Sequence, residues 1–321
     1  MKPFSQFDFF KKEDLGSLIL AAGSLGDALI TLPAIRLLQN RTKVILAGTS
    51  PYCNLGSELL GVNQVVSLDP ILTFLHLEKI SANPMHLYPP CFQSSVNFVY
   101  CFLKTGDYSY LSSLPYFKKT CIVLPSEKFD SFLKRKIWAG LYWTDMLKDI
   151  KKKDKLNNKL IKNQELFAAG QSILSNYTIK SPLILHPGSG STLKNPSLHF
   201  LRSVASFISK NFNQEILVIY GEAEDPIQIQ KAFSNLDHVK ILKEIVTLKQ
   251  LAGIFWNAKA YIGNDSGVSH LASACGLKSF VFFQTTNPNI WSPLFSKTYW
   301  LPAGTHHLTQ ELKKWVGTWL T

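Results

Sequence analysis

The sequence predicts an α/β protein made of two doubly wound, Rossmann-like domains that face each other across a cleft. Apolar runs suited to buried parallel strands alternate along the chain with segments of helical periodicity. The chain has 321 residues, which is long for one core and suits two domains of ordinary size. A polar, lysine-rich stretch over residues 148–163 divides it near the middle. We therefore expect one domain over 1–163 and another over 164–321, with the C-terminal helix free to pack back on the first.

The strands and helices are expected in a regular order. In the first half the apolar runs are 18–22, 44–47, 65–68 and 122–124. In the second half they are 183–186, 216–220, 239–242, 261–263 and 280–283. Helical periodicity is clearest at 197–210, 248–257 and 267–274. Residues 73–119, rich in proline, serine and aromatic side chains, fit neither pattern.

Composition indicates a globular protein with a basic surface. Apolar residues make up 46% of the chain, no repeat or low-complexity tract occurs, and the net charge is +12. Such a surface attracts phosphorylated metabolites, acidic membranes or nucleic acid, although a solvated surface without a partner explains it equally well. The five cysteines form no CxxC pair, which fits a reducing cytoplasm.

The apolar run over residues 15–38 resembles a signal peptide or membrane anchor at first sight. Asp27 interrupts it, however, and a charge at the centre of a bilayer costs about 3 kcal/mol or more. The run is better explained as a buried strand, a glycine turn at 23–26 and a helix that begins near Asp27. We therefore expect a soluble, cytoplasmic protein.

Four motifs follow expected strands, at the strand ends where such folds bind ligands. In the first, "AAGSLGDALITLP" at 21–33, Asp27 stands at a helix start. It is either a helix cap, which is common there, or a functional carboxylate. The spacing GxGxxG of dinucleotide-binding proteins is absent.

The second motif, "HPGSGSTLKNPSLHF" at 186–200, offers backbone N–H groups and hydroxyls ahead of a helix. Lys194 adds a positive charge, so the loop suits a phosphate, although an ordinary connection with a surface lysine is the simpler alternative. In the third motif, "YGEAED" at 220–225, a carboxylate can accept hydrogen bonds from ribose hydroxyls, or it can simply favour the first turn of a helix.

The fourth motif, "AKAYIGNDSGVSHLASACG" at 258–276, contains a strand, a turn and a second helix start. Asp265 or Ser266 can cap this helix, which leaves N–H groups for a phosphate. His270 lies one turn into the helix, where a histidine is more often a hydrogen bonder in the core than a ligand.

Taken together, "HPGSG…K", "GxxE" and "GNDSGVSHLASACG" resemble the ADP-heptose:lipopolysaccharide heptosyltransferases of glycosyltransferase family 9. The opening "GSLGDALITLPAIRLL" resembles the same family, and the resemblance runs from residue 18 to about residue 293. It implies a GT-B fold, an acceptor-side first domain, a donor-binding second domain, and an inverting transfer with Asp27 as the catalytic base. It also implies donor contacts by Ser189, Gly190, Ser191, Lys194, Glu224 (in preference to Glu222), Asp265, Ser266, Gly267 and His270.

Two departures from the family pattern concern the site. Ala21 stands where the family often has arginine, and the tryptophan usual before Pro196 is missing. Donor chemistry is thus better supported than the identity of the acceptor. No DxD motif occurs, so we expect no metal and no cofactor. Lys194 and the helix start would stabilise the departing diphosphate instead.

The expected partners are a nucleotide-sugar donor, in the first place ADP-heptose, and a lipid-linked oligosaccharide acceptor from the lipopolysaccharide core. No nucleic-acid motif is present. Aromatic and basic side chains mix over residues 128–155, which fits either an ordinary helix and linker or a peripheral contact with an anionic inner-membrane surface. Two alternatives stay open: a transferase of the same fold with another nucleotide sugar, and a non-catalytic nucleotide-sugar binder.

Overall fold

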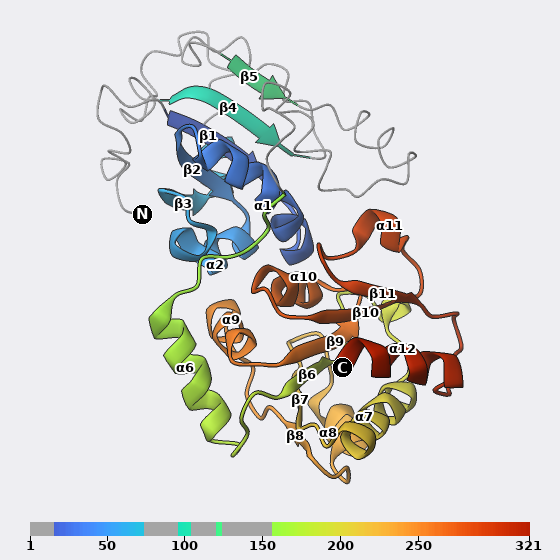
Figure 1. Cartoon of the computed structure of the whole chain (residues 1–321). Helices are drawn as coiled ribbons and strands as arrows, with labels where there is room; N and C mark the ends of the chain where they lie inside the picture. Colours follow the sequence, from blue (N-terminus) through green and yellow to red (C-terminus); the bar gives the residue numbers. More distant parts are fainter. Residues whose placement is uncertain (1–15, 74–95, 104–119, 124–155) are drawn as a thin grey trace. The chain divides into compact units, whose positions relative to one another are not determined.

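The computed structural model describes residues 16–73, 96–103, 120–123 and 156–321 (Figure 1). The chain divides into two compact units, Met1–Asn157 and Asn158–Thr321. Each unit contains its own parallel sheet with helices packed against it. The two parallel α/β sheets confirm the fold class that the sequence predicts.

The boundary between the units falls just inside the lysine-rich stretch. Residues that the sequence assigns to the end of the first domain are attached to the second unit. Leu160 N donates to Ala274 O at 2.8 Å, and Asn158 Nδ2 lies 3.5 Å from Ser273 Oγ. Leu160 and Asn158 are both buried.

The first unit holds a five-stranded sheet in the order β3-β2-β1-β4-β5, in which every pair is parallel. Its strands are β1 (Gly16–Ala21), β2 (Lys43–Gly48), β3 (Gln64–Ser67), β4 (Val96–Phe102) and β5 (Thr120–Val123). Helix α1 (Leu25–Gln39) follows β1, and α2 (Ser50–Leu60) follows β2. β1 is central and buried along its whole length, so the turn that follows it lies in the middle of the sheet's edge.

The second unit holds a six-stranded parallel sheet in the order β11-β10-β9-β6-β7-β8. Its strands are β6 (Leu183–His186), β7 (Ile216–Val218), β8 (Val239–Ile241), β9 (Ala260–Asn264), β10 (Ser279–Phe283) and β11 (Lys297–Trp300). Its helices are α6 (Gln164–Ser175), α7 (Leu198–Phe212), α8 (Pro226–Phe233), α9 (Leu248–Trp256), α10 (Gly267–Ala274), α11 (Pro288–Trp291) and α12 (Gln310–Leu320). A short 3₁₀ turn, η5 (Thr192–Lys194), precedes α7.

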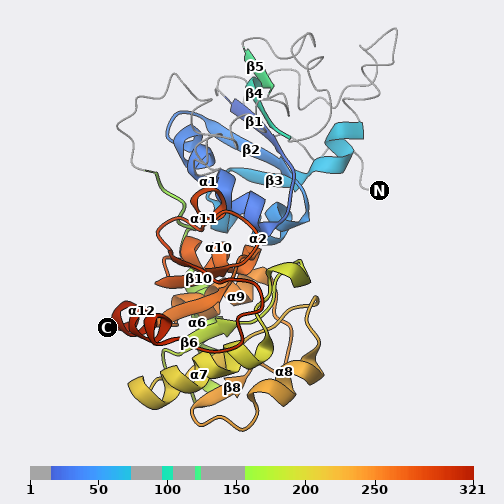
Figure 2. The same cartoon turned by 90° about the vertical axis from the view of Figure 1, so that its right-hand side faces the viewer.

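Helices cover both faces of this second sheet (Figures 1 and 2). Side chains of α7, α8 and α12 share one buried cluster with the strands, whose members on β9 are Ala260 and Ile262. Tyr261 alternates with these two and points to the opposite face. There its ring packs on Phe255 of α9, with centroids 5.7 Å apart, and its hydroxyl lies 2.9 Å from Ser269 Oγ of α10. The sheet is thus buried from both sides.

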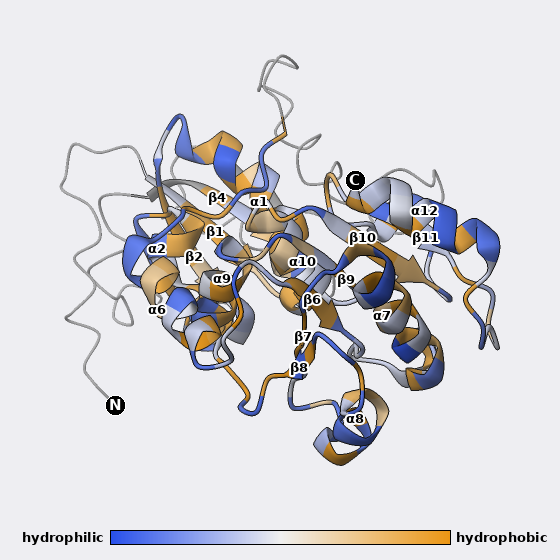
Figure 3. Cartoon of the chain, turned by 60° about the horizontal axis from the view of Figure 1, so that its bottom comes forward, coloured by the Kyte–Doolittle hydropathy of each residue, from blue (hydrophilic) through white to orange (hydrophobic). Residues whose placement is uncertain are grey.

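The C-terminal helix α12 packs within the second unit. Leu312, Val316 and Trp319 lie on one side of the helix and join the buried cluster under the sheet. The hydropathy colours of Figure 3 show this amphipathic pattern, with apolar strands inside and, around them, helices that have an apolar side and a polar side. The sequence left open whether this helix packs back on the first domain; its core contacts are with the second unit.

Helices α6 and α9 meet at a backbone contact between two glycines. A Cβ on Gly170 would lie 2.1 Å from the carbonyl carbon of Gly253, and a Cβ on Gly253 would lie 2.1 Å from Leu166 O. Such distances leave no room for any side chain at either position. The small residues therefore fix how closely α6, the first helix of this unit, packs on α9.

The apolar N-terminal run forms a strand and a helix separated by a turn, as the sequence predicts. β1 ends at Ala21, and α1 holds 15 residues. A membrane-spanning helix needs about 20. Across the described ranges, none of the helices combines the length and apolar character that a membrane crossing requires.

Candidate functional site

Three of the four motifs lie on neighbouring strands of the second sheet. The loops after β6, β7 and β9 carry them, and the sheet order places β6 between β9 and β7. Because the strands are parallel, their carboxyl ends meet at one edge of the sheet. The structure therefore brings together loops that lie far apart in the sequence.

The loop after β6 is shaped by its own polar groups. Ser189 Oγ donates to Ser191 O at 2.8 Å and accepts from Ser191 N at 3.3 Å. Ser189 is buried, so its hydroxyl maintains the loop. A Cβ added at Gly190 would meet nothing within 4 Å, which leaves the backbone at this point open to approach. Ser197 then caps α7 by accepting from Phe200 N at 3.2 Å.

Lys194 and Asp265 join the β6 loop to the β9 loop. Lys194 Nζ lies 2.8 Å from Asp265 Oδ2, and their side chains are 31% and 8% exposed. The Thr286 hydroxyl donates to the same carboxylate oxygen. Since a nearly buried carboxylate needs a partner, this lysine compensates its charge. Two residues that the sequence selects for donor binding thus form one ion pair.

The N-terminus of α10 lies beside this ion pair. Ser266 is the cap: its Oγ accepts from Ser269 N at 3.3 Å, which decides between the two capping residues that the sequence allowed. Gly267 is the first residue of the helix, and His270 is buried one turn further on. The helix dipole makes this end attractive to an anion.

Glu224 is held against the β6 loop rather than extended into solvent. Its Oε2 accepts from Gly221 N at 2.6 Å and lies 3.7 Å from His186 Nε2. A Cβ on Gly188 would come within 1.6 Å of Glu224 Oε1. Burial raises the pKa of Glu224, but the nearby imidazole of His186 and the N–H of Gly221 outweigh it, so that the pKa is below its ordinary value. Glu222, the other acid of this motif, is exposed.

Two residues of this region escape the sequence analysis. His186 ends β6, is buried, and is the partner of Glu224. Its place directly before the glycine-rich loop is the signal that could have identified it. Thr286 binds Asp265 from the loop after β10, and nothing in the local sequence distinguishes it from its neighbour Thr285.

Asp27 takes part in a capping box in the first unit. Ser24 is the cap of α1, and its backbone N and Oγ each donate to Asp27 Oδ2 at 2.9 Å. Gly23 has φ +135°, and a Cβ there would lie 2.5 Å from Asp27 Cβ. Gly26, which the sequence places in the turn, belongs to the helix. Asp27 thus has a structural role, and its role as a base stays a prediction.

A family model supports the resemblance drawn from the motifs. Residues 201–314 match the model of glycosyltransferase family 9 (heptosyltransferase). The match covers β7 to β11 and therefore includes the loops that carry Glu224 and Asp265. No curated protein matches the chain.

Solved structures extend the likeness to nearly the whole chain. A family 9 glycosyl transferase from Veillonella parvula is 14% identical, with a TM-score of 0.70 over 94% of this chain and 88% of the other. E. coli ADP-heptose lps heptosyltransferase II is 14% identical, with a TM-score of 0.67 over 95% and 98%. E. coli heptosyltransferase WaaC with ADP is 16% identical, with a TM-score of 0.62 over the same shares.

These findings agree with each other and with the motifs. At such low identity the solved structures show the fold, and the family model adds the sequence likeness in the second unit. The family match supports glycosyltransferase activity. The chain carries the sequence signature of glycosyltransferase family 9 over residues 201–314 and the GT-B fold of its heptosyltransferases over almost its whole length.

Proposed function

We propose that the chain is an inverting glycosyltransferase that moves heptose from ADP-heptose to a lipopolysaccharide core acceptor. The observation that carries the donor half of this proposal is the contact between Lys194 and Asp265, which joins two strand-end loops beside a helix N-terminus. The family match over 201–314 supports the reaction class. Structures of WaaC with ADP and with ADP-2-deoxy-2-fluoro heptose support the choice of donor.

In the proposed reaction Asp27 removes the proton from the acceptor hydroxyl. The hydroxyl oxygen attacks the anomeric carbon on the face opposite the leaving group, so that the new glycosidic bond has the inverted configuration. The bond between the sugar and the diphosphate breaks, and ADP departs. Lys194 and the N–H groups at the start of α10 stabilise the negative charge on the departing diphosphate.

The remaining donor contacts follow from the same arrangement. The backbone around Gly190 is open for a phosphate oxygen, and the hydroxyl of Ser191 lies in the same loop. Glu224 would accept hydrogen bonds from the ribose hydroxyls. Ser189 supports the loop, and Ser266, Gly267 and His270 form the helix start on the other side.

A transfer assay tests the proposal. The protein is incubated with ADP-heptose and a core acceptor that lacks the heptose, and the acceptor mass and the released ADP are measured. One heptose gained per ADP released is the expected result. Transfer only from UDP- or GDP-sugars would favour another donor, while binding of ADP-heptose without transfer from any donor would identify a binding protein. Undiminished turnover with excess EDTA is expected, since we propose no metal.

The proposal includes where in the cell the enzyme works. A lipid-linked acceptor requires a cytoplasmic enzyme to visit an anionic membrane surface, and residues 128–155 are the segment whose composition suits that contact. This segment lies outside the described residues. Sedimentation with anionic and neutral vesicles, across rising salt, measures the contact, and equal or absent binding to both vesicle types would contradict it.

A further inference from the structure

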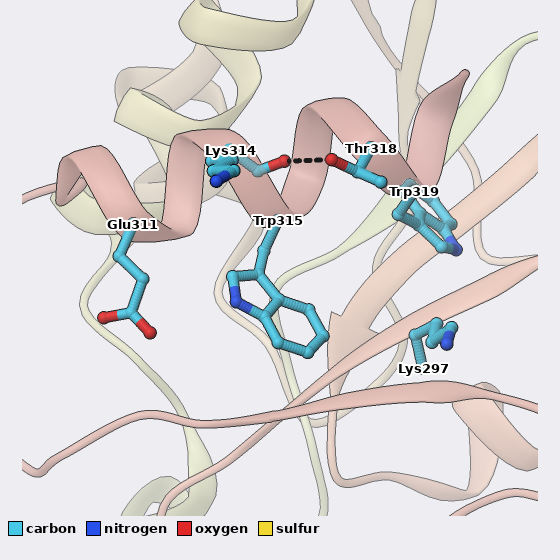
Figure 4. A pocket seen from close by; sticks show the side chains of 6 residues that line it. All are labelled: Lys297, Glu311, Lys314, Trp315, Thr318 and Trp319. Atoms are coloured by element: carbon cyan, nitrogen blue, oxygen red, sulfur yellow. Dashed lines mark hydrogen bonds between the residues drawn. The ribbon is translucent and has the colours of Figure 1, made fainter.

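A pocket of about 370 Å³ lies between β11 and α12 of the second unit (Figure 4). Its size is within the range of small-molecule sites. One face of α12 and the start of β11 form its walls. The lining residues are Lys297, Glu311, Lys314, Trp315, Thr318 and Trp319. The pocket is therefore built from residues that none of the four sequence motifs includes.

This pocket is separate from the proposed donor site. Lys297 is the first residue of β11 and is paired with Phe280 near the start of β10. The loops that carry Lys194 and Asp265 follow the opposite, carboxyl ends of β6 and β9. A ligand in this pocket would therefore lie at the other end of the sheet from a donor diphosphate.

Two indole rings give the pocket its apolar surface. Trp315 is 47% exposed, and its ring packs edge-on against Tyr299 with 6.4 Å between the ring centroids. Figure 4 shows the ring of Trp315 open to the pocket, between Glu311 and Lys297. Trp319 is only 5% exposed and closes the far end. A half-exposed tryptophan face inside a hollow suits a flat ring that stacks on it.

The free polar groups of the pocket are nearly all donors. Trp319 Nε1 is buried and has no hydrogen-bond partner among the described residues. In Figure 4 this nitrogen lies on the side of Trp319 that faces Lys297. The Thr318 hydroxyl already donates to Lys314 O at 2.9 Å. A buried donor without an acceptor costs stability, so its position at the wall of a pocket indicates a ligand that brings the acceptor.

The charged side chains around the pocket favour an anion, as its hydrogen-bond donors do. Lys297 and Lys314 line the pocket against a single acid, Glu311. A third lysine, Lys278, places its Nζ 5.9 Å from the centroid of the Trp319 ring. The pocket thus combines positive charge, an unpaired N–H and an aromatic wall, which together select a negative group carried on a flat ring.

We propose that this pocket is a second binding site of the chain, for a small anion borne on an aromatic ring. The anion, a phosphate or a carboxylate, contacts Lys297 and accepts from Trp319 Nε1, while the ring stacks on Trp315. This site is independent of the proposed transferase activity, and neither proposal requires the other.

Phenyl phosphate and benzoate are the probes, titrated by calorimetry against the full chain in the Lys194→Ala background, where the proposed donor site is weakened. Inorganic phosphate and phenol supply the two halves separately. Phenyl phosphate should bind at least about fivefold more tightly than either of its halves, because ring stacking adds to the charge contact. The preferred probe of the two identifies the kind of anion.

Three variants locate the binding. Trp315→Ala should remove the advantage over inorganic phosphate, and Lys297→Gln should weaken binding about threefold, as expected for an exposed charge. Trp319→Phe keeps a ring but removes the N–H, so it should weaken binding; it should also lower the melting temperature somewhat, because the smaller ring leaves a cavity in the buried cluster. Trp300→Ala removes an exposed tryptophan outside the pocket and should change nothing.

The proposal is overturned if neither probe binds, or if inorganic phosphate binds as tightly as phenyl phosphate. It is equally overturned if Trp300→Ala weakens binding as much as Trp315→Ala does. None of these results bears on heptose transfer, which is measured with the wild-type chain and a different ligand.

Discussion

In the first unit the hydrogen bonds that Ser24 donates to the candidate base span three residues, whereas in the second unit Lys194 and Glu224 contact residues far away in the sequence. Asp27 receives both of its Ser24 bonds from three positions upstream. Lys194 pairs instead with Asp265, and Glu224 lies against His186. Loss of the Ser24–Asp27 contact should therefore act on the first turn of α1, while loss of the Lys194–Asp265 contact should affect two loops.

The largest effect is expected in the first unit. Asp27→Asn keeps an oxygen that can accept from Ser24 but removes the base, so turnover should fall by roughly 10²-fold or more with ADP binding unchanged. Turnover is measured with ADP-heptose and the core acceptor, and ADP binding by calorimetry. Asp69→Asn, at an exposed carboxylate of the same unit, is the control. Full activity of Asp27→Asn would leave Asp27 with its capping role alone.

In the second unit, Lys194→Ala should weaken ADP binding by about 1.5–3 kcal/mol, the range for hydrogen bonds to charged groups. It should also lower the melting temperature, because the carboxylate of Asp265 is only 8% exposed and would lose its cation. Adding Asp265→Asn should restore stability but not binding.

Lys231→Ala, at an exposed lysine on α8, is the control for charge. An unchanged ADP affinity in Lys194→Ala would remove this residue from the donor site. An unchanged melting temperature would mean that the ion pair contributes nothing to folding.

Substitution of one glycine in each loop compares the backbone of the turn before α1 with that of the loop after β6. Gly23→Ala forces a side chain onto φ +135° and into contact with Asp27, so it should cost about 1–3 kcal/mol of unfolding free energy. Gly190→Ala meets nothing within 4 Å and should cost less than about 1 kcal/mol. Urea unfolding measures both. Equal losses would show that the turn before α1 is not the strained one.

The smallest effect concerns acid stability. The pKa of Glu224 is lowered from 4.5 in the folded chain, so folding favours its ionised form. This contribution is fully present above pH 4.5, shrinks as the pH falls below that value, and is lost once the pH passes the folded pKa. Glu224→Gln should therefore flatten the decline of the urea midpoint in this range, whereas Glu222→Gln should not. Identical curves for the two variants would contradict the role of His186.

Most of the fold could be predicted because buried parallel strands are continuous apolar runs. The expected helix 267–274 coincides with α10. β4 and β11 were not predicted. β4 lies within residues 73–119, which fit neither the strand pattern nor the helix pattern. β11 is an edge strand with the sequence KTYW, too short and too polar to appear as an apolar run.

The site could be predicted only in part, for a physical reason. Residue types that suit a diphosphate are visible in the loops, since hydroxyls, glycine and lysine before a helix can bind an anion. The pairing of Lys194 with Asp265 depends instead on β9 lying beside β6, which no local pattern encodes. The same holds for Thr286, which reaches Asp265 from the loop after β10.

The contact of α6 with α9 has a consequence for how this sequence can diverge. At Gly170 and Gly253 every substitution adds atoms where backbone already lies, so neither glycine can be replaced without a compensating change elsewhere. Compensation would need the two helices to separate, which many side chains would have to accommodate at once. Among relatives whose loops have diverged beyond alignment, a pair of small residues at this crossing should persist, and it would mark equivalent helices where overall identity no longer can.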